Sequence, residues 1–432
     1  MERYSDYKDS GVKWLGEIPR HWEVIKTSRV FSSIGSGTTP KSGSEEYYTE
    51  DGIHFLQTGD LNDGYIFVTS KKITEKALRD TNLTIYPKES LIIAMYGATI
   101  GKLGILNIDS TVNQACCVLP YSSKIKTKYA FYVFFAAKKD LIFQSRGGGQ
   151  PNISQDTIKS ERIPIPPLCE QKSIVKYLDD TTAKIDEAIA QQRKMIDLLN
   201  ERKQIIINNA VTKGLAPNVP MKDSGVEWIG EIPEHWVSVK TSYVFNHIGS
   251  GTTPKSGQED YYGEEGTPFL QTGDLNDSYI CETSKKITDK ALRETNLKIY
   301  PKGSLVIAMY GATIGKLGVL DIFTTVNQAC CVLPENEMMN TKYAFYYLMV
   351  AKNDLIQQSK GGGQPNISQE TIRNEKFLVP PIKEQRDIAF YIDNKCNPIN
   401  KAIEAVNKKI TLLQERKQII INDVVTGKVK VV

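Results

Sequence analysis

Long apolar segments are missing from this sequence of 432 residues. No run approaches the roughly 18 residues that a membrane-spanning helix needs. The first residues, MERYSDYKDSG, are too polar for a signal peptide, so we expect a cytoplasmic protein without a membrane partner. Histidine is also scarce: the four histidines form no HExxH motif and have no cysteine beside them. This pattern argues against a metal site and against a histidine-based catalytic triad.

The seven cysteines include no CxxC pair. Two adjacent pairs, Cys116-Cys117 and Cys330-Cys331, lie inside the apolar segment QACCVLP. Neighbouring residues on a strand point to opposite faces, so such a pair suits small buried positions better than a disulfide or a zinc site. We therefore expect these cysteines to be buried and reduced.

Motifs for nucleotide hydrolysis and for base methylation are lacking. GATIGKLG at Gly97, repeated at Gly311, resembles a phosphate-binding P-loop, but three residues separate its first two glycines and Leu103 replaces the magnesium-binding Ser or Thr. An amino-methyltransferase needs Asp or Asn before Pro-Pro and an aromatic residue, and both Pro-Pro pairs here follow an aliphatic residue. The Glu-x-Lys tripeptides at Glu201 and Glu415 have no strand-borne aspartate partner, so we interpret them as solvated helix charges. We predict a chain without catalytic residues, a metal or a cofactor of its own.

One unit is written twice in the chain. DSGVKWLGEIPRHW at Asp9 returns as DSGVEWIGEIPEHW at Asp223, 214 residues later. IGSGTTPKSG, FLQTGDLND, IAMYGATIGKLG, TVNQACCVLP, GGGQPNIS and ERKQIIIN follow at the same offset without a gap. A repeat of this length indicates a duplicated domain rather than a solenoid.

Each copy begins with short β-branched and aromatic runs broken by Gly, Pro, Asn and Asp, which is typical of a compact strand-rich domain. One helix is predicted inside each copy, from Thr127 and from Thr341. IPIPPL at Ile163 and LVPPI at Leu378 should be stiff extended connectors, because proline fixes φ and restricts the preceding residue. A helical pattern follows each connector. We therefore divide the chain into a domain over 1–167, a long helix over 168–213, a second domain over 214–381 and a second long helix over 382–432.

The two long segments carry an imperfect heptad pattern of the coiled-coil type. Some 43 residues at 1.5 Å each give a rod of about 64 Å, and Pro398 should kink or split the second rod. Neither rod can bury its apolar seam alone, so we expect an antiparallel pair with one domain at each end, a pseudo-twofold axis and neighbouring chain termini. The fold class is α+β, two strand-rich domains separated by a two-helix coiled coil. The predicted seam positions are Ile174, Leu178, Thr181, Ile185, Ala188, Gln192, Met195, Leu199, Arg202 and Ile206, with Ile388, Ile392, Lys395, Ile399, Ala402, Val406, Lys409, Leu413, Arg416 and Ile420 in the second helix.

Polar and glycine-rich loops in each copy suit a nucleic acid, and the net charge of +4 permits such a partner without requiring it. GSGTTPKSG places hydroxyls, backbone N–H groups and a lysine together, which can grip phosphate, although an ordinary turn explains the same residues. QTGDLND, TVNQA and GGGQPNIS supply amides that can pair bidentately with adenine. Three glycines also let the backbone approach a sugar-phosphate strand. The candidate DNA-binding residues are Thr38, Thr39, Lys41, Gln57, Tyr96, Thr99, Lys102, Asn113, Gln114, Arg146, Gln150 and Asn152, with their copies Thr252, Thr253, Lys255, Gln271, Tyr310, Thr313, Lys316, Asn327, Gln328, Lys360, Gln364 and Asn366.

The ordered combination of motifs resembles the specificity subunit of type I restriction-modification systems. YKDSGVKWLGEIPRHW opens a domain, GGGQPNIS lies near its end, an IPxPP connector follows, and a helix begins with EQxxIVxYLD and closes with ERKQIIIN. The resemblance covers essentially the whole chain. It implies two target-recognition domains that each read one half of a bipartite site on double-stranded DNA.

The resemblance also implies partners. The two helices would set the spacing of the half-sites and dock two modification subunits, which bind S-adenosylmethionine and methylate adenine, while a motor-nuclease restriction subunit joins for cleavage. Because the candidate loops are identical in the two domains, we expect both to read the same half-site, which predicts an interrupted palindrome. Two other classes remain as alternatives, a structural helical spacer and a stand-alone modifying enzyme.

Overall fold

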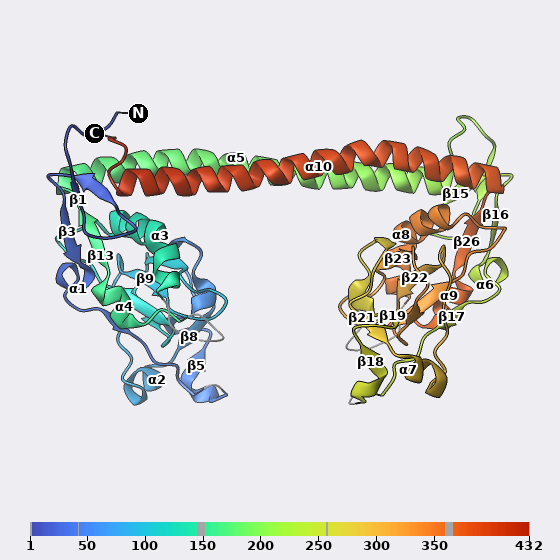
Figure 1. Cartoon of the computed structure of the whole chain (residues 1–432), viewed down its shortest axis with the longest axis horizontal. Helices are drawn as coiled ribbons and strands as arrows, with labels where there is room; N and C mark the ends of the chain where they lie inside the picture. The colour runs from blue at the N-terminus through green and yellow to red at the C-terminus, as the bar shows by residue number, and fades with distance from the viewer. Residues whose placement is uncertain (1, 42, 145–151, 256–257, 359–365, 432) are drawn as a thin grey trace. The chain divides into compact units, whose positions relative to one another are not determined.

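The computed structural model of this chain describes residues 2–41, 43–144, 152–255, 258–358 and 366–431. These residues form two compact units: unit 1 comprises 1–192 and 408–432, and unit 2 comprises 193–407. The division falls within the two long helices, so each unit contains a globular domain and part of both helices (Figure 1). Among the described residues, no helix is both long enough and apolar enough to cross a membrane.

The globular domain of unit 1 is built on two small mixed sheets. The five-stranded sheet has the order β4-β12-β9-β10-β7, and the four-stranded sheet has the order β11-β6-β8-β5. Two further pairs, β1-β2 and β13-β3, complete it. The elements are β1 (Tyr7–Asp9), β2 (Glu17–Pro19), β3 (Glu23–Lys26), α1 (Thr27–Val30), β4 (Gly35–Ser36), η1 (Glu45–Tyr47), β5 (Tyr48–Thr49), β6 (Ile53–Leu56), η2 (Thr58–Asp60), β7 (Gly64–Ile66), β8 (Lys71–Ile73), α2 (Glu75–Asp80), β9 (Leu91–Ala94), β10 (Leu103–Leu106), β11 (Thr111–Val112), β12 (Cys116–Leu119), α3 (Thr127–Phe143), α4 (Gln155–Ser160) and β13 (Arg162–Ile165).

Unit 2 repeats this topology strand for strand, in the orders β17-β25-β22-β23-β20 and β18-β21-β19-β24. The equal sheet orders agree with the duplication seen in the sequence. Its elements are β14 (Met221–Asp223), β15 (Glu231–Pro233), β16 (Val237–Lys240), α6 (Thr241–Val244), β17 (Gly249–Ser250), η3 (Glu259–Tyr261), β18 (Tyr262–Gly263), β19 (Thr267–Leu270), η4 (Thr272–Asp274), β20 (Ser278–Ile280), β21 (Lys285–Ile287), α7 (Asp289–Glu294), β22 (Leu305–Ala308), β23 (Leu317–Leu320), β24 (Thr325–Val326), β25 (Cys330–Leu333), α8 (Thr341–Gln357), α9 (Gln369–Asn374) and β26 (Lys376–Val379).

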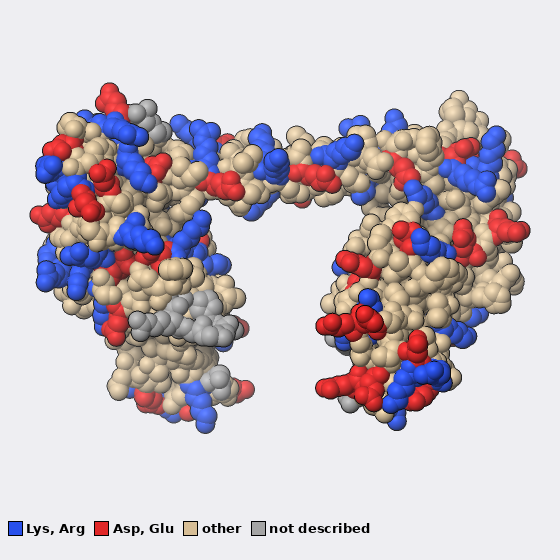
Figure 2. Space-filling model, in the orientation of Figure 1, with Lys and Arg blue, Asp and Glu red and all other residues tan. Residues whose placement is uncertain are grey.

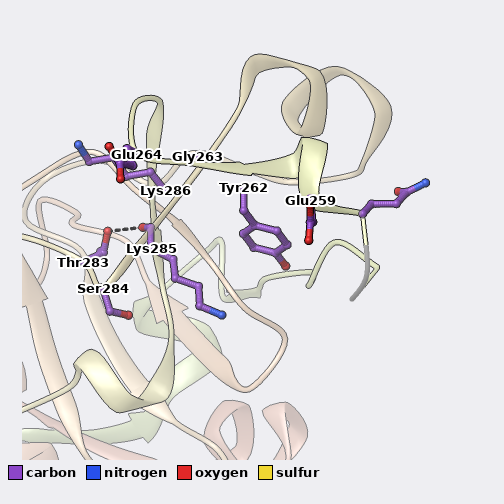
Figure 3. A pocket seen from close by; sticks show the side chains of 9 residues that line it. Glu259, Tyr262, Gly263, Glu264, Thr283, Ser284, Lys285 and Lys286 are labelled. Carbon is purple, nitrogen blue, oxygen red and sulfur yellow. Dashed lines mark hydrogen bonds between the residues drawn. The ribbon is translucent and has the colours of Figure 1, made fainter. Parts of the chain in front are cut away.

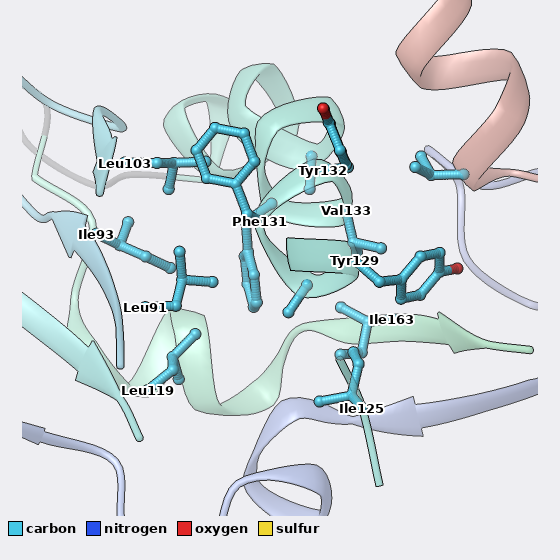
Figure 4. Packing of buried hydrophobic residues seen from close by; sticks show 14 of the residues in the cluster. Leu91, Ile93, Leu103, Leu119, Ile125, Tyr129, Phe131, Tyr132, Val133 and Ile163 are labelled. Atoms are coloured by element: carbon cyan, nitrogen blue, oxygen red, sulfur yellow. The ribbon is translucent and has the colours of Figure 1, made fainter. Parts of the chain in front are cut away.

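The five-stranded sheet is buried on both faces, which explains why its central strands are apolar throughout. Leu91 and Ile93 of β9 face a core shared with helix α3, as Figure 4 shows, while Ile92 packs into a second cluster on the other face. Cys117 packs in the core that α3 shares, and Cys116 packs in the second cluster. Both pairs of adjacent cysteines are free and buried, so the expectation from the sequence is confirmed.

The two proline-rich connectors differ in part from the prediction. They are extended, but three residues of the first and two of the second belong to strands: β13 pairs with β3, and β26 pairs with β16. Pro164 tolerates this position because β13 lies in a two-stranded ribbon, where a strand has a free edge. The predicted internal helices are confirmed as α3 and α8.

The long helices are α5 (Leu168–Lys213) and α10 (Ile382–Val425). Within unit 1, Lys417 of α10 pairs with Asp186 of α5 at 2.7 Å. Within unit 2, the Lys203 ammonium donates to the Asn400 side-chain oxygen at 3.0 Å. The contact in unit 1 joins an earlier residue of α5 to a later residue of α10, and the contact in unit 2 joins a later residue of α5 to an earlier residue of α10. The two helices are therefore antiparallel.

The predicted seam of the helix pair needs a correction at every second position, where the residue that follows the predicted one lies in the seam. Met195 is 48% exposed, and Arg202 and Lys395 are exposed as well. The buried or half-buried positions follow one residue later, at Ile189, Ile196, Lys203, Cys396, Ile403, Ile410 and Lys417. Four of these seven positions are isoleucine, so this seam buries more apolar surface than the predicted one, which is why it prevails.

Two features of α10 also correct the sequence analysis. The helix runs through Pro398 without a break, because buried residues on both sides, Cys396 and Ile399, hold it against the core while a single hydrogen bond is lost. The helix ends at Val425 rather than continuing to residue 432. Gly427 then adopts φ 72°, and the chain turns back so that the backbone of Lys430 forms an isolated antiparallel β-bridge with that of Glu2. The chain termini therefore lie together, as predicted.

Candidate nucleic-acid interface

The loop after β4 packs its backbone against the strand β11. A Cβ atom on Gly37 would come within 1.6 Å of the Val112 carbonyl oxygen, so only glycine fits there. This close approach places the half-buried Thr39 beside the exposed Gln114, and the Thr39 hydroxyl donates to the Gln114 side-chain oxygen. Two candidate residues that are 75 positions apart in the chain are thereby brought together.

A second pair adjoins the first. The backbone of Tyr96 forms an isolated bridge with Asn152, and Met95 donates its N–H to the carbonyl of Ala115, next to Gln114. In unit 2 the corresponding tyrosine, Tyr310, is itself hydrogen-bonded to Gln328, the copy of Gln114. We call Thr39, Tyr96, Gln114 and Asn152, with their copies Thr253, Tyr310, Gln328 and Asn366, the amide cluster.

The QTGD loop lies beside this cluster. Asn113 donates its N–H to the Leu56 carbonyl, which precedes Gln57. Asp60 then fixes the loop, because one of its carboxylate oxygens accepts from the Gln57 N–H at 2.8 Å and the other from the Ser70 N–H at 3.0 Å. Asn113 itself has a structural task, since its side-chain oxygen accepts from the Ala115 N–H at 3.1 Å. The amide left for a ligand at this corner is that of Gln114.

Thr99 and Lys102 lie in the turn between β9 and β10. Gly97 and Gly101 in this turn have φ of 80° and 71°, a backbone conformation that favours glycine. The segment therefore joins two antiparallel strands and does not lead into a helix, as a P-loop would. The segment thus lacks the strand-to-helix geometry of a P-loop, and its half-buried threonine and lysine remain candidates for contacts to phosphate.

The structure leaves part of the predicted site open. Thr38 and Lys41 lie on the exposed part of the loop after β4. Arg146, Gln150 and their copies Lys360 and Gln364 lie outside the described residues. The remaining residues of unit 2 hold the same places as their copies in unit 1, namely Thr252, Lys255, Gln271, Thr313, Lys316 and Asn327. Asn327 differs in one respect, because its side-chain oxygen is buried without a hydrogen-bond partner among the described residues.

Electrostatics at the cluster favour neutral hydrogen-bonding groups. Burial, with the neighbouring Cys116, raises the pKa of Tyr96, so its phenol keeps its proton. Burial also raises the pKa of Cys117 to about 12. Lys and Arg are interspersed with Asp and Glu over the visible face of both units (Figure 2). In the described part of the chain, no group of three metal-ligating side chains gathers in one place.

The sequence analysis missed one element of this surface, the segment Thr69–Lys72 with Tyr48 beside it. These residues line an open hollow in unit 1, and their copies line the same hollow in unit 2. The signal was present in the sequence, because TSKK recurs unchanged at 69 and 283.

The comparisons with known proteins agree with this double architecture. The model of the type I restriction modification DNA specificity domain matches the chain twice, over residues 19–196 and 233–412. The chain belongs to this family. Each match spans most of one globular domain and the first part of the long helix that follows it.

Relatives of the specificity family match along nearly the full length. The putative type I restriction enzyme MjaX specificity subunit of Methanocaldococcus jannaschii is 26% identical, over 98% of this chain and 98% of the relative. The EcoKI specificity subunit of Escherichia coli is 22% identical, over 91% of this chain and 87% of the relative. A solved chain from a study of complex assembly and conformational transition of the type I R-M system is 17% identical, has a TM-score of 0.65, and is matched over 95% of this chain and 99% of its own length. That likeness shows the shared fold.

Proposed function

We propose that this chain is the DNA-reading subunit of a type I restriction-modification complex, and that each unit reads one half of a bipartite site on double-stranded DNA. The observation that carries this proposal is the double match of the DNA specificity domain, each copy with its own amide cluster. Side-chain amides of this kind can pair bidentately with adenine in the major groove. The chain itself carries out no catalysis in this proposal.

The partners follow from the family. Two modification subunits, which bind S-adenosylmethionine and methylate adenine N6, dock on the long helices, and restriction subunits join for cleavage. Reversing the charges of the exposed residues Arg193 and Lys194 of α5 (Arg193→Glu with Lys194→Glu) should weaken co-purification of the modification subunit without unfolding the domains. Unchanged co-purification after such reversals on several helix faces would refute this role.

The half-sites should be the same or nearly the same. All residues of the amide cluster are identical in the two units, and equal side chains on equal scaffolds prefer equal bases. An antiparallel helix pair would then present the second domain to the opposite strand, so the target is an interrupted palindrome with a methylated adenine in each half. The segments that differ between the copies, SEEYYTEDGIH at Ser44 and NIDST at Asn107, would alter this at one base pair if they enter the groove, at about 1–3 kcal/mol.

Methylation-sensitive sequencing of genomic DNA from cells that express this chain with its modification subunit tests the function directly. We expect one interrupted palindrome that is methylated on both strands. Two unrelated half-sites would refute the equal-readout proposal, and the absence of any new methylated motif would refute DNA reading itself. The chain purified alone should show no methyl transfer and no cleavage.

The amide cluster is tested with Gln114→Ala and Gln328→Ala together. If these amides read bases, the double variant should bind the target duplex at least about 30-fold more weakly but a scrambled duplex with unchanged affinity, since each of the two good bidentate pairs contributes about 1–3 kcal/mol of discrimination. Gln191→Ala on the exposed face of α5 is the matched control. An equal loss for both duplexes would assign the amides to the DNA backbone instead.

A further inference from the structure

Each unit has an open hollow beside the QTGD loop. In unit 1 it lies between Tyr48 and Glu50 on one side and Ser70, Lys71 and Lys72 on the other. In unit 2 the corresponding hollow is lined by Tyr262, Ser284, Lys285 and Lys286, together with Glu259 and Glu264. Figure 3 shows this second hollow, where the Thr283 hydroxyl donates to the Lys285 carbonyl.

The lysines of the hollow are held but not neutralised. Lys71 Nζ lies 5.4 Å from the Tyr48 ring centroid, and Lys285 Nζ lies 5.5 Å from that of Tyr262. Throughout the described ranges, no carboxylate forms an ion pair with Lys71, Lys72 or their copies. By contrast, Lys76 on the neighbouring helix α2 is paired with Glu46. The hollow thus presents lysine ammonium groups that form no ion pair among the described residues, one of them close to a tyrosine ring, together with an exposed serine hydroxyl.

The two copies differ directly before the hollow but not in its TSKK segment. Exposed residues have changed there: Phe67 and Val68, at 65% and 68% exposure, correspond to Cys281 and Glu282. The following TSKK segment is unchanged, although its serine and first lysine are exposed in both units. Each copy therefore presents the same serine and lysines at this place.

The hollow is tied to the candidate base-reading surface by one carboxylate. Asp60 accepts from the N–H groups of both Gln57 and Ser70, and Asp274 does the same for Gln271 and Ser284 at 2.8 and 3.1 Å. A group bound in the hollow therefore lies next to the QTGD loop, which adjoins the amide cluster through the hydrogen bond from the Asn113 N–H to the Leu56 carbonyl. Ammonium and hydroxyl donors of this kind are those that bind phosphate oxygens in protein–DNA complexes.

We propose that each hollow binds a phosphate of the DNA backbone and thereby fixes the register of the neighbouring amide cluster on the duplex. This proposal rests on the DNA-reading function proposed above. Lys71, Lys72 and the Ser70 hydroxyl hold the phosphate in unit 1, and Lys285, Lys286 and Ser284 hold it in unit 2. Because unit 2 has Glu282 where unit 1 has Val68, directly before the TSKK segment, its hollow binds phosphate more weakly.

The test compares Lys71→Ala with Lys285→Ala in the complex with the modification subunit. Binding is measured from 50 to 300 mM salt to the methylated target duplex and to a scrambled duplex of equal length. Each lost phosphate contact reduces the slope of log K against log salt by about 0.9 and costs about five-fold in affinity at 0.15 M salt. The double variant should therefore lose about 30-fold on both duplexes, and Lys71→Ala should lose more than Lys285→Ala.

Two controls separate the phosphate contact from other causes. Lys8→Ala with Lys222→Ala removes the same number of charges from the hairpins β1-β2 and β14-β15 and should leave the slope unchanged. Lys71→Arg with Lys285→Arg keeps the charge and should restore most of the affinity. A double alanine variant with unchanged slope, or with a loss confined to the target duplex, would overturn the proposal. A wild-type complex that binds neither duplex would instead overturn the DNA-reading function.

Discussion

Replacing Glu170 by alanine should loosen the N-terminal hairpin β1-β2 from the start of helix α5. Glu170 is 7% exposed and accepts three side-chain hydrogen bonds. One comes from Trp22 Nε1 at 3.1 Å, one from His21 Nε2 at 2.9 Å and one from the Tyr4 hydroxyl. The carboxylate also lies in the first turn of α5, where a negative charge stabilises a helix.

The magnitude follows from what each donor loses. Trp22 is fully buried, so its N–H is left without a partner at about 1–3 kcal/mol. The Tyr4 hydroxyl is half-buried and loses about 1 kcal/mol. The His21 side chain is 50% exposed and can turn to water, so it contributes little. Glu170→Ala should therefore cost about 2–4 kcal/mol of local stability.

Unit 2 provides the matched comparison. Glu384 accepts from Trp236 and His235 in the same way, but asparagine replaces the tyrosine, at position 218. Glu384→Ala should therefore cost about 1 kcal/mol less than Glu170→Ala. Glu170→Gln keeps one acceptor and should have the smallest effect.

Hydrogen exchange followed by mass spectrometry measures the two hairpins separately, in peptides covering residues 7–22 and 221–236. Exchange should accelerate most in the first peptide of the Glu170→Ala variant, with little change in its second peptide. If Glu384→Ala opens its own hairpin as much as Glu170→Ala does, the tyrosine bond contributes nothing. Unchanged exchange in both variants would refute the assignment of these carboxylates as anchors.

Three further predictions concern stability and reactivity. At pH 8 the native chain should react with a thiol reagent at the exposed Cys169 and Cys281 only, and all seven thiols should react after unfolding; reaction of a third native thiol would contradict the described burial. Burial raises the pKa of Glu375 from 4.5 to about 7, so the contribution of this carboxyl to the stability of unit 2 is fully present below pH 4.5 and is lost, at most about 3 kcal/mol, as pH rises through 7. Glu375→Gln should flatten thermal stability over this range, and an unchanged pH profile would exclude the carboxyl as the cause. Ile189→Ala should cost about 2–4 kcal/mol in helix unfolding followed by circular dichroism, whereas Met195→Ala should cost under about 0.5 kcal/mol; the reverse order would restore the originally predicted seam.

The helix seam shows how far a heptad pattern leads. Two phases of the 4-3 spacing share every second position, such as Leu178 and Ile185, and differ by one residue at the others. The heptad pattern placed Met195 in the seam, whereas the folded chain half-buries its neighbour Ile196. The packing of α5 against α10 decides which of the two residues is buried, because a helix face is buried only where the partner helix covers it.

The candidate site shows the same division more strongly. Its motifs could be listed from the sequence because duplication repeats them, yet Thr39 and Gln114, or Tyr96 and Asn152, are too distant along the chain for their contact to be predicted. Asn113 was named as a base reader, and the fold uses its oxygen to hold a turn. Such assignments depend on long-range strand pairing, which local pattern does not contain.

The sequence by itself determined the duplication, the order of domain and helix, and the bounds of α5, because an offset of 214 residues and a helical period are local, one-dimensional properties. Only the tertiary structure decided which face of each helix is buried, which loops meet in the amide cluster, and that TSKK lines a hollow beside it. These features depend on which surfaces, far apart in the sequence, pack together and exclude water. The free energy of that burial is determined by the whole folded chain and not by any local segment.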